Sequence, residues 1–182
     1  MNFVEPIRDS QTVQFVEEYL KRTNKRNYIM LIIGIYTGLR ISDVLKLRVK
    51  DVKNRANISI REIKTGKQKM FEINPRLKKE LAVYVQGKNQ NDYLIKSRQG
   101  INKPISRVQA YLILRDLADL FSLEQVGCHT LRKTFGYHHY NQYHDVLILQ
   151  KIFNHSHPTI TMRYIGIEQE TINKSIKNFK IY

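Results

Sequence analysis

The stretch NISIREIKTGKQKMFEI, Asn57 to Ile73, breaks an otherwise helical pattern and decides the fold class. NISIREI alternates polar and β-branched residues, as a half-buried strand does, and QKMFEI resumes as a second strand. KTGK between them supplies a turn near Thr65–Gly66, so the sequence predicts an antiparallel β-hairpin. DYLIKS, Asp92 to Ser97, is a possible third strand.

Helical patterns lie on both sides of this hairpin. Those before it are a segment capped by Asp9 or Ser10, the run from Asn27 to Thr37 that Gly38 stops, and a short segment capped by Ser42. Those after it are Pro75 to about Val85, Ser106 to Phe121, Thr130 to about Tyr140, Asp145 to Phe153, a helix opening at Pro158, and Thr171 to Phe179. There is no internal repeat and no linker rich in Pro or Gly. The sequence therefore predicts one domain over residues 1–182, mainly α with a small antiparallel β-sheet (α+β).

The charge of the chain indicates a polyanionic partner. Lys and Arg number 31 against 16 Asp and Glu, a formal net charge of +15. Such an excess raises self-repulsion, and binding of nucleic acid is the commonest reason to keep it. An anionic membrane surface is a weaker alternative, because no basic amphipathic helix with a Trp or Phe face stands out. A merely soluble basic protein stays open as a third reading.

Neither a membrane anchor nor an oxidising compartment is indicated. The N-terminus has no apolar signal core, and the longest apolar run, Tyr28 to Tyr36, is too short to span a bilayer. The single cysteine, Cys128, cannot form an internal disulfide. We therefore expect a cytoplasmic protein.

Two arginine motifs stand near predicted helix starts. In TGLRISD, Arg40 lies in the turn after a buried helix, and Asp43, three residues on, can hold its guanidinium. In HTLR, Thr130 is the predicted N-cap, so His129 and Arg132 lie at a helix entrance, where a phosphate binds readily. Simpler readings stay open for both motifs: a surface ion pair for the first and local capping for the second.

A tyrosine follows two histidines in FNHSHPTITMRYIGI, Phe153 to Ile167. His155 precedes the helix that Pro158 opens, and Ile160 and Tyr164 share one face of that helix. On this spacing alone, Tyr164 reads as a packing residue.

The spacing of the histidines does not predict a metal site. His138 and His139 are adjacent, and His155 and His157 are two apart; neither is a chelating helical pair. No HExxH motif, cysteine cluster or GxxxxGK[ST] loop accompanies them. We expect neither a metal nor a cofactor.

Taken together, these segments resemble the catalytic domain of the tyrosine recombinases, the phage integrase family. TGLRISD, HTLR and FNHSHPTITMRY match the family's three boxes in order, with Asn154 in place of the usual glycine, and IKTGK supplies the family's hairpin lysine, Lys64. Tyr164 follows His155 by nine residues and Arg132 by thirty-two, as in the family. The resemblance covers nearly the whole chain and implies the integrase-like catalytic fold of DNA breaking–rejoining enzymes.

The resemblance implies a role for each residue of a site. Tyr164 would attack a phosphodiester and form a 3′-phosphotyrosyl link, and Lys64 would protonate the 5′-oxygen that leaves. The residues that would surround the phosphate are Arg40, His129, Arg132 and His155, with His129 as the candidate base and Asp43 supporting Arg40. Lys67 and Lys69 lie beside Lys64 and are alternatives for its role.

The implied function is site-specific DNA recombination, as in integration, excision or inversion, by metal-independent cleavage and rejoining of strands. The implied partners are double-stranded DNA, further copies of the chain on that DNA, from dimer to tetramer, and accessory DNA-bending proteins. A catalytically silent DNA-binding regulator and a type IB topoisomerase are the alternatives.

The resemblance also bears on the two ends of the chain. We expect no N-terminal core-binding or arm-binding domain here, so that the chain is either an excised catalytic domain or similar to the short fimbrial-switch invertases. The tail from Thr171 carries Ile172, Ile176 and Phe179 on one stripe. Either it packs on its own domain or, as in relatives, it docks on a neighbouring protomer.

Overall fold

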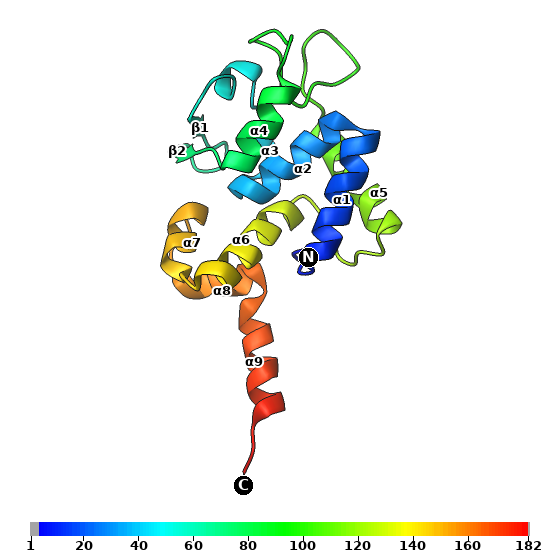
Figure 1. Cartoon of the computed structure of the whole chain (residues 1–182). Coiled ribbons are helices and arrows are strands. Elements are labelled where there is room, and N and C mark those ends of the chain that lie inside the picture. Colours follow the sequence, from blue (N-terminus) through cyan, green and yellow to red (C-terminus); the bar gives the residue numbers. More distant parts are fainter. Residues whose placement is uncertain (1–3, 182) are drawn as a thin grey trace.

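The computed structural model describes residues 4–181, with residues 168 and 170 described by their backbone only. Its elements before the loop at residue 100 are α1 (Ser10–Thr23), α2 (Lys25–Thr37), α3 (Ile41–Val44), a 3-10 turn (Val49–Asp51), β1 (Asn57–Arg61), β2 (Gln68–Glu72) and α4 (Pro75–Tyr84). Those after it are α5 (Arg107–Leu120), α6 (Thr130–Tyr143), α7 (Val146–Phe153), α8 (Pro158–Ile165) and α9 (Ile167–Asn178). The prediction of a mainly helical fold with a small antiparallel sheet is confirmed (Figure 1).

The predicted hairpin is present, and its register is set by a short turn. β1 and β2 pair antiparallel from Asn57 opposite Glu72 to Arg61 opposite Gln68. The backbone of Glu62 closes the turn by hydrogen bonds to Lys67 and from Gly66. Gly66 has φ +67°, a conformation that glycine adopts without strain, so it allows this reversal.

The predicted third strand, residues 92–97, is wrong. Within the described chain this segment forms only isolated bridges, Tyr93 with Arg48 and Lys96 with Pro104, and the sheet has two strands. Its apolar residues Leu94 and Ile95 are buried in the core. The short apolar run that suggests a strand therefore reflects burial of a loop rather than sheet pairing.

Helix ends follow the predicted caps in part. Asp9, rather than Ser10, caps α1 by accepting hydrogen bonds from Gln11 and Thr12. Gly38 ends α2 in the left-handed conformation, as expected. The expected cap Ser42 is wrong, because Arg40 stands at the N-cap position and α3 begins at Ile41.

The core has two parts, and α6 contributes to both. α2 is buried along most of its length and packs against α1, α4 and α6. A smaller cluster joins α6, α7 and α8 and consists of Tyr137, Leu149, Phe153, Ile165 and Ile167. Figure 1 shows the hairpin and α2–α4 on one side of α6, with α7 and α8 on the other.

The last helix starts earlier than the sequence suggests and extends away from the rest of the domain. α9 begins at Ile167 rather than Thr171, directly after Gly166, which has φ +79°. It points away from the other helices (Figure 1). No helix among residues 4–181 has the length and apolar character that crossing a membrane requires.

Candidate active site

Arg132, in the first turn of α6, is the centre of the site. It is 2% exposed and donates hydrogen bonds to two main-chain oxygens, Gly38 at 2.7 Å and Phe153 at 2.9 Å. These oxygens belong to the ends of α2 and α7. Burial lowers the pKa of Arg132, although a guanidinium stays charged in any protein. Arg132 therefore joins three helices at one point and brings a cation there.

Arg40 lies in the turn that precedes α3 and pairs with an acid that the sequence did not suggest. Its Nη1 lies 2.9 Å from Oε1 of Glu62, whose side chain is fully buried. The expected partner Asp43 instead accepts a hydrogen bond from the N–H of Ile63 at 2.9 Å. The i, i+3 expectation fails because the end of the hairpin, not the guanidinium, occupies the Asp43 carboxylate.

His155 lies just past the end of α7. Asn154, which stands where the family has glycine, ends that helix at φ +55°, a left-handed conformation that Asn tolerates. Nδ1 of His155 is 3.0 Å from the hydroxyl of Thr161 on α8. Burial, followed by the neighbouring Arg132 and Arg40, lowers the pKa of His155 to about 4. His155 is therefore neutral near neutral pH and can donate one hydrogen bond into the site.

Tyr164 lies on α8 with its hydroxyl directed at the site. The hydroxyl oxygen is 3.2 Å from Nδ1 of His129. The ring contacts Phe153 and His155, with centroids 5.5 and 5.2 Å apart. Burial raises the pKa of Tyr164, while Arg132 and Arg40 act in the opposite direction. The tyrosine is thus both a packing residue and a partly buried hydroxyl beside a base.

His129 occupies the N-cap position of α6. The predicted cap Thr130 is wrong: it is the first helical residue, and its hydroxyl accepts a hydrogen bond from Gly127. Burial first, then Arg132 and Arg107, lower the pKa of His129. The imidazole is therefore neutral near neutral pH, as a proton acceptor must be.

The hairpin lysines differ in their contacts. Nζ of Lys67 lies 2.9 Å from Oδ1 of Asn154, and Nζ of Lys69 contacts Glu62 at 3.0 Å as well as the main-chain oxygen of Ile152. Lys64 is exposed at the turn, and no hydrogen bond or ion pair of its ammonium occurs within residues 4–181. Its charge nevertheless contributes to the lowered pKa of His155.

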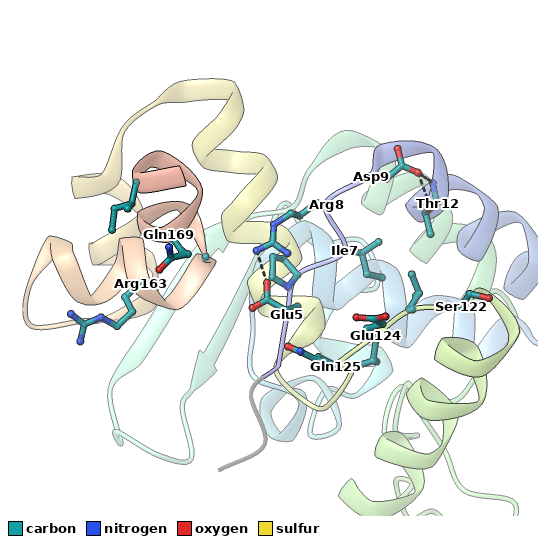
Figure 2. A pocket seen from close by; sticks show the side chains of 15 residues that line it. Glu5, Ile7, Arg8, Asp9, Thr12, Ser122, Glu124, Gln125, Arg163 and Gln169 are labelled. Carbon is teal, nitrogen blue, oxygen red and sulfur yellow. Dashed lines mark hydrogen bonds and ion pairs between the residues drawn. The ribbon is translucent and has the colours of Figure 1, made fainter. Parts of the chain in front are cut away.

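Two pockets border the elements of this cluster. One of about 810 Å³ lies between the N-terminal segment, the loop after α5 and the α8–α9 junction; Figure 2 shows Glu5 and Arg8 on the N-terminal segment and Arg163 and Gln169 on the α8–α9 side. Another of about 670 Å³ borders His129 and is lined on α5 by basic and aromatic side chains, Arg107, Tyr111 and Arg115. No group of His, Cys, Asp or Glu suited to a metal ion occurs in the part of the chain that is described.

The structure brings the sequence-predicted residues to one place. The residues that the three boxes and the hairpin supply are Arg40, Asp43, Lys64, His129, Arg132, His155 and Tyr164. Sequence reasoning did not single out Glu62, and it named Lys69 only as an alternative. A glutamate at the end of a strand looks solvent-exposed in sequence, and only the folded position of Arg40 indicates otherwise.

Two arginines and two histidines around a tyrosine, on a mainly helical fold, define a tyrosine recombinase catalytic domain. The model of the phage integrase family matches residues 6–171. The chain therefore belongs to the phage integrase family.

Similar proteins agree with that membership. The probable integrase/recombinase YoeC of Bacillus subtilis (strain 168) is 49% identical over 179 residues, which cover 98% of each chain. A tyrosine recombinase of Pseudothermotoga lettingae is 28% identical over 162 residues. This match covers 85% of this chain and 55% of that protein. The crystal structure of XerA recombinase superposes with a TM-score of 0.75 at 21% identity, over 98% of this chain and 67% of that one. At that identity the structural likeness shows the fold alone.

Proposed function

We propose that this chain, a tyrosine-type site-specific recombinase by family and fold, cleaves and rejoins double-stranded DNA through Tyr164. The observation that carries the proposal is the 3.2 Å approach of the Tyr164 hydroxyl to a neutral imidazole, beside the buried Arg132. The phenolic oxygen attacks the scissile phosphorus, and its proton passes to His129. A phosphotyrosyl bond to the 3′ end forms as the bond from phosphorus to the 5′-oxygen breaks.

The nucleophile needs the base because few phenols are ionised near neutrality. A free tyrosine has a pKa of about 10, and burial raises the pKa of Tyr164 above its usual value. General-base catalysis contributes on the order of 10²- to 10⁴-fold when the acceptor is within hydrogen-bond reach. His129 is within this reach, and its lowered pKa keeps the imidazole neutral so that it can accept the proton.

The phosphate oxygens are bound by Arg40 and Arg132, with His155 donating a further hydrogen bond. A guanidinium carries five N–H donors. Arg132 directs two of these to main-chain oxygens, which leaves others for the phosphate. Charge that develops on the equatorial oxygens is thus met by groups already fixed in place, which is how preorganised sites lower a barrier.

Lys64 is the acid that protonates the leaving 5′-oxygen. The contacts of the three hairpin lysines support this choice, since Lys67 and Lys69 are engaged with Asn154 and with Glu62. Lys64 stands at the exposed turn. Its ammonium can therefore reach a DNA strand laid over the site.

DNA bound here is proposed to be held by several copies of the chain, from dimer to tetramer. The support is the segment from Ile172 in α9 to Ile181 beyond its end, where four apolar side chains are 44–75% exposed: Ile172, Ile176, Phe179 and Ile181. We propose that this stripe docks on a second copy, since +15 copies assemble more readily along a polyanion. Synapsis on DNA that survives deletion of residues 171–182 would contradict this assignment. Accessory DNA-bending proteins and a cytoplasmic location belong to the same proposal.

The test is covalent trapping on a library of nicked duplexes with randomised sequence around the nick. The short strand diffuses away after cleavage, so the protein stays joined to DNA, and sequencing of the joined strands gives the preferred site. We expect an adduct with the wild type, none with Tyr164→Phe, and at least a hundredfold less with Arg132→Ala. Tyr143→Phe, at an exposed tyrosine of α6, is the matched control and keeps the adduct. An adduct with Tyr164→Phe would exclude Tyr164 as the nucleophile.

A further inference from the structure

Glu62 is a buried acid at the base of the turn that carries Lys64. Its side chain is 0% exposed, whereas glutamate is rarely buried without a partner. Oε1 lies 2.9 Å from Nη1 of Arg40 and 3.0 Å from Nζ of Lys69. One carboxylate oxygen thus stands between a cation of the α2–α3 turn and a cation of β2.

The rest of Glu62 holds the turn itself. Oε2 accepts a hydrogen bond from the hydroxyl of Thr65 at 2.7 Å. The main-chain N–H of Glu62 donates to Lys67 at 3.0 Å, and its carbonyl accepts from Gly66 at 2.9 Å. Side chain and backbone therefore fix both sides of Lys64, the residue between these contacts.

Lys69 extends this connection to the third catalytic segment. Besides Glu62, its ammonium contacts the carbonyl of Ile152 in the last turn of α7, where a cation suits the helix dipole. His155 follows that turn. The pair of Glu62 and Lys69 therefore links the hairpin to the segment of His155.

We propose that Glu62 is a positioning residue for strand cleavage. It holds the turn that carries Lys64 next to Arg40, so that the acid Lys64 and the phosphate-binding Arg40 act on the same phosphodiester. The inference rests on the proposed roles of Lys64 and Arg40. Burial acts to raise the pKa of Glu62, but the Thr65 hydroxyl and Lys69 hold it to about 2, so the carboxylate stays charged at every assay pH. A glutamate that only stabilised the fold would slow all steps alike, whereas a positioning residue for the acid slows proton delivery.

The experiment compares two leaving groups in single-turnover cleavage of the nicked duplex selected from the library. In one substrate the bridging 5′-oxygen of the scissile phosphate is intact, and in the other it is sulfur. A thiolate leaves without a proton, since a thiol has a pKa of about 8.5. We expect Glu62→Gln to slow the oxygen substrate by about 30-fold or more and the sulfur substrate by about threefold or less. Equal losses on the two substrates, or no loss, would overturn the proposal.

Controls separate this inference from the proposed function. Glu72→Gln makes the same change at an exposed position of the same hairpin and keeps both rates within about twofold. Lys64→Ala should show the same sulfur rescue as Glu62→Gln. Without that rescue, Lys64 is not the acid and the inference falls with it. Rescue in Lys64→Ala but not in Glu62→Gln overturns the inference alone.

Thr65→Val keeps the test valid if Glu62→Gln does not fold. This variant removes only the hydroxyl that joins the carboxylate to the turn. The same pattern is expected in weaker form, a loss of about threefold on the oxygen substrate and none on the sulfur substrate. Equal losses would again contradict the positioning role.

Discussion

Arg132 and Glu62 are both buried charged residues. Only Arg132 could be recognised as a site residue from the sequence. Arg132 stands in a box that the sequence makes recognisable, and its contacts with Gly38 and Phe153 explain why an arginine is needed there. Glu62 has no such signal, because α3, the 3-10 turn and β1 separate it from its partner Arg40 along the chain. The motifs that contain Arg40 and Arg132 can be recognised in the sequence, but the ion pair of Arg40 with Glu62 joins distant segments and could not be predicted.

His155 gives a prediction on pH that tests its environment. Its pKa is about 4 in the folded protein, chiefly because of burial, and about 6.5 in an unfolded chain. Between these values the unfolded state binds more protons, so the free energy of unfolding falls as pH falls from 6.5 to 4. In His155→Gln this contribution is absent, and we expect a shallower loss over that window in urea titrations at half-unit pH steps. Parallel curves for variant and wild type would contradict the lowered pKa.

A helix or strand could be predicted from the sequence where the residues that determine it lie within one short stretch. The hairpin was found because alternation and a turn glycine coincide within one short stretch. Residues 92–97 contain a short apolar run that resembles a strand, yet the N–H of Leu94 bonds to Leu47 and the carbonyl of Ile95 accepts from Ile105, so each side pairs with a different segment. A strand needs a partner of matching length, which a local pattern cannot supply.

Gly136 on α6 sets how closely α8 approaches, and α8 carries Tyr164. A Cβ at this glycine would lie 2.6 Å from Ile165 and 2.7 Å from Phe153. We expect Gly136→Ala to lower the free energy of unfolding by about 1–2 kcal/mol, since overpacking outweighs the gain in helix propensity. Cleavage should fall by about tenfold at a temperature where the variant is folded, because a shifted α8 misplaces the nucleophile.

The measurements are urea denaturation and single-turnover cleavage. Asn141→Ala, at an exposed position of the same helix, is the control and should change stability by less than about 0.5 kcal/mol. If Gly136→Ala is as stable and as active as the wild type, α6 and α8 do not meet as closely as the structure has them.

The whole molecule carries more positive charge than its catalytic cluster uses. The formal net charge is +15, while the site contains the buried acids Asp43 and Glu62 among its cations. Much of the excess must therefore lie on the surface, as on α5, where Arg107 and Arg115 line the pocket beside His129. Composition predicts a polyanionic partner, but which basic side chains gather on one surface follows only from the fold.

The affinity of the protein for DNA should depend steeply on salt concentration. Each phosphate contacted releases counterions, so the logarithm of the binding constant falls with the logarithm of salt concentration by about 0.9 per contact. For about six contacts, affinity for a nonspecific duplex should drop roughly a thousandfold between 50 and 200 mM salt, measured by fluorescence anisotropy. Lys64→Ala should reduce the slope by about 0.9, whereas Tyr164→Phe, which removes no charge, should leave it unchanged. A slope near zero in the wild type would mean that the charge serves something other than DNA, and an unchanged slope in Lys64→Ala would place that ammonium away from the phosphates.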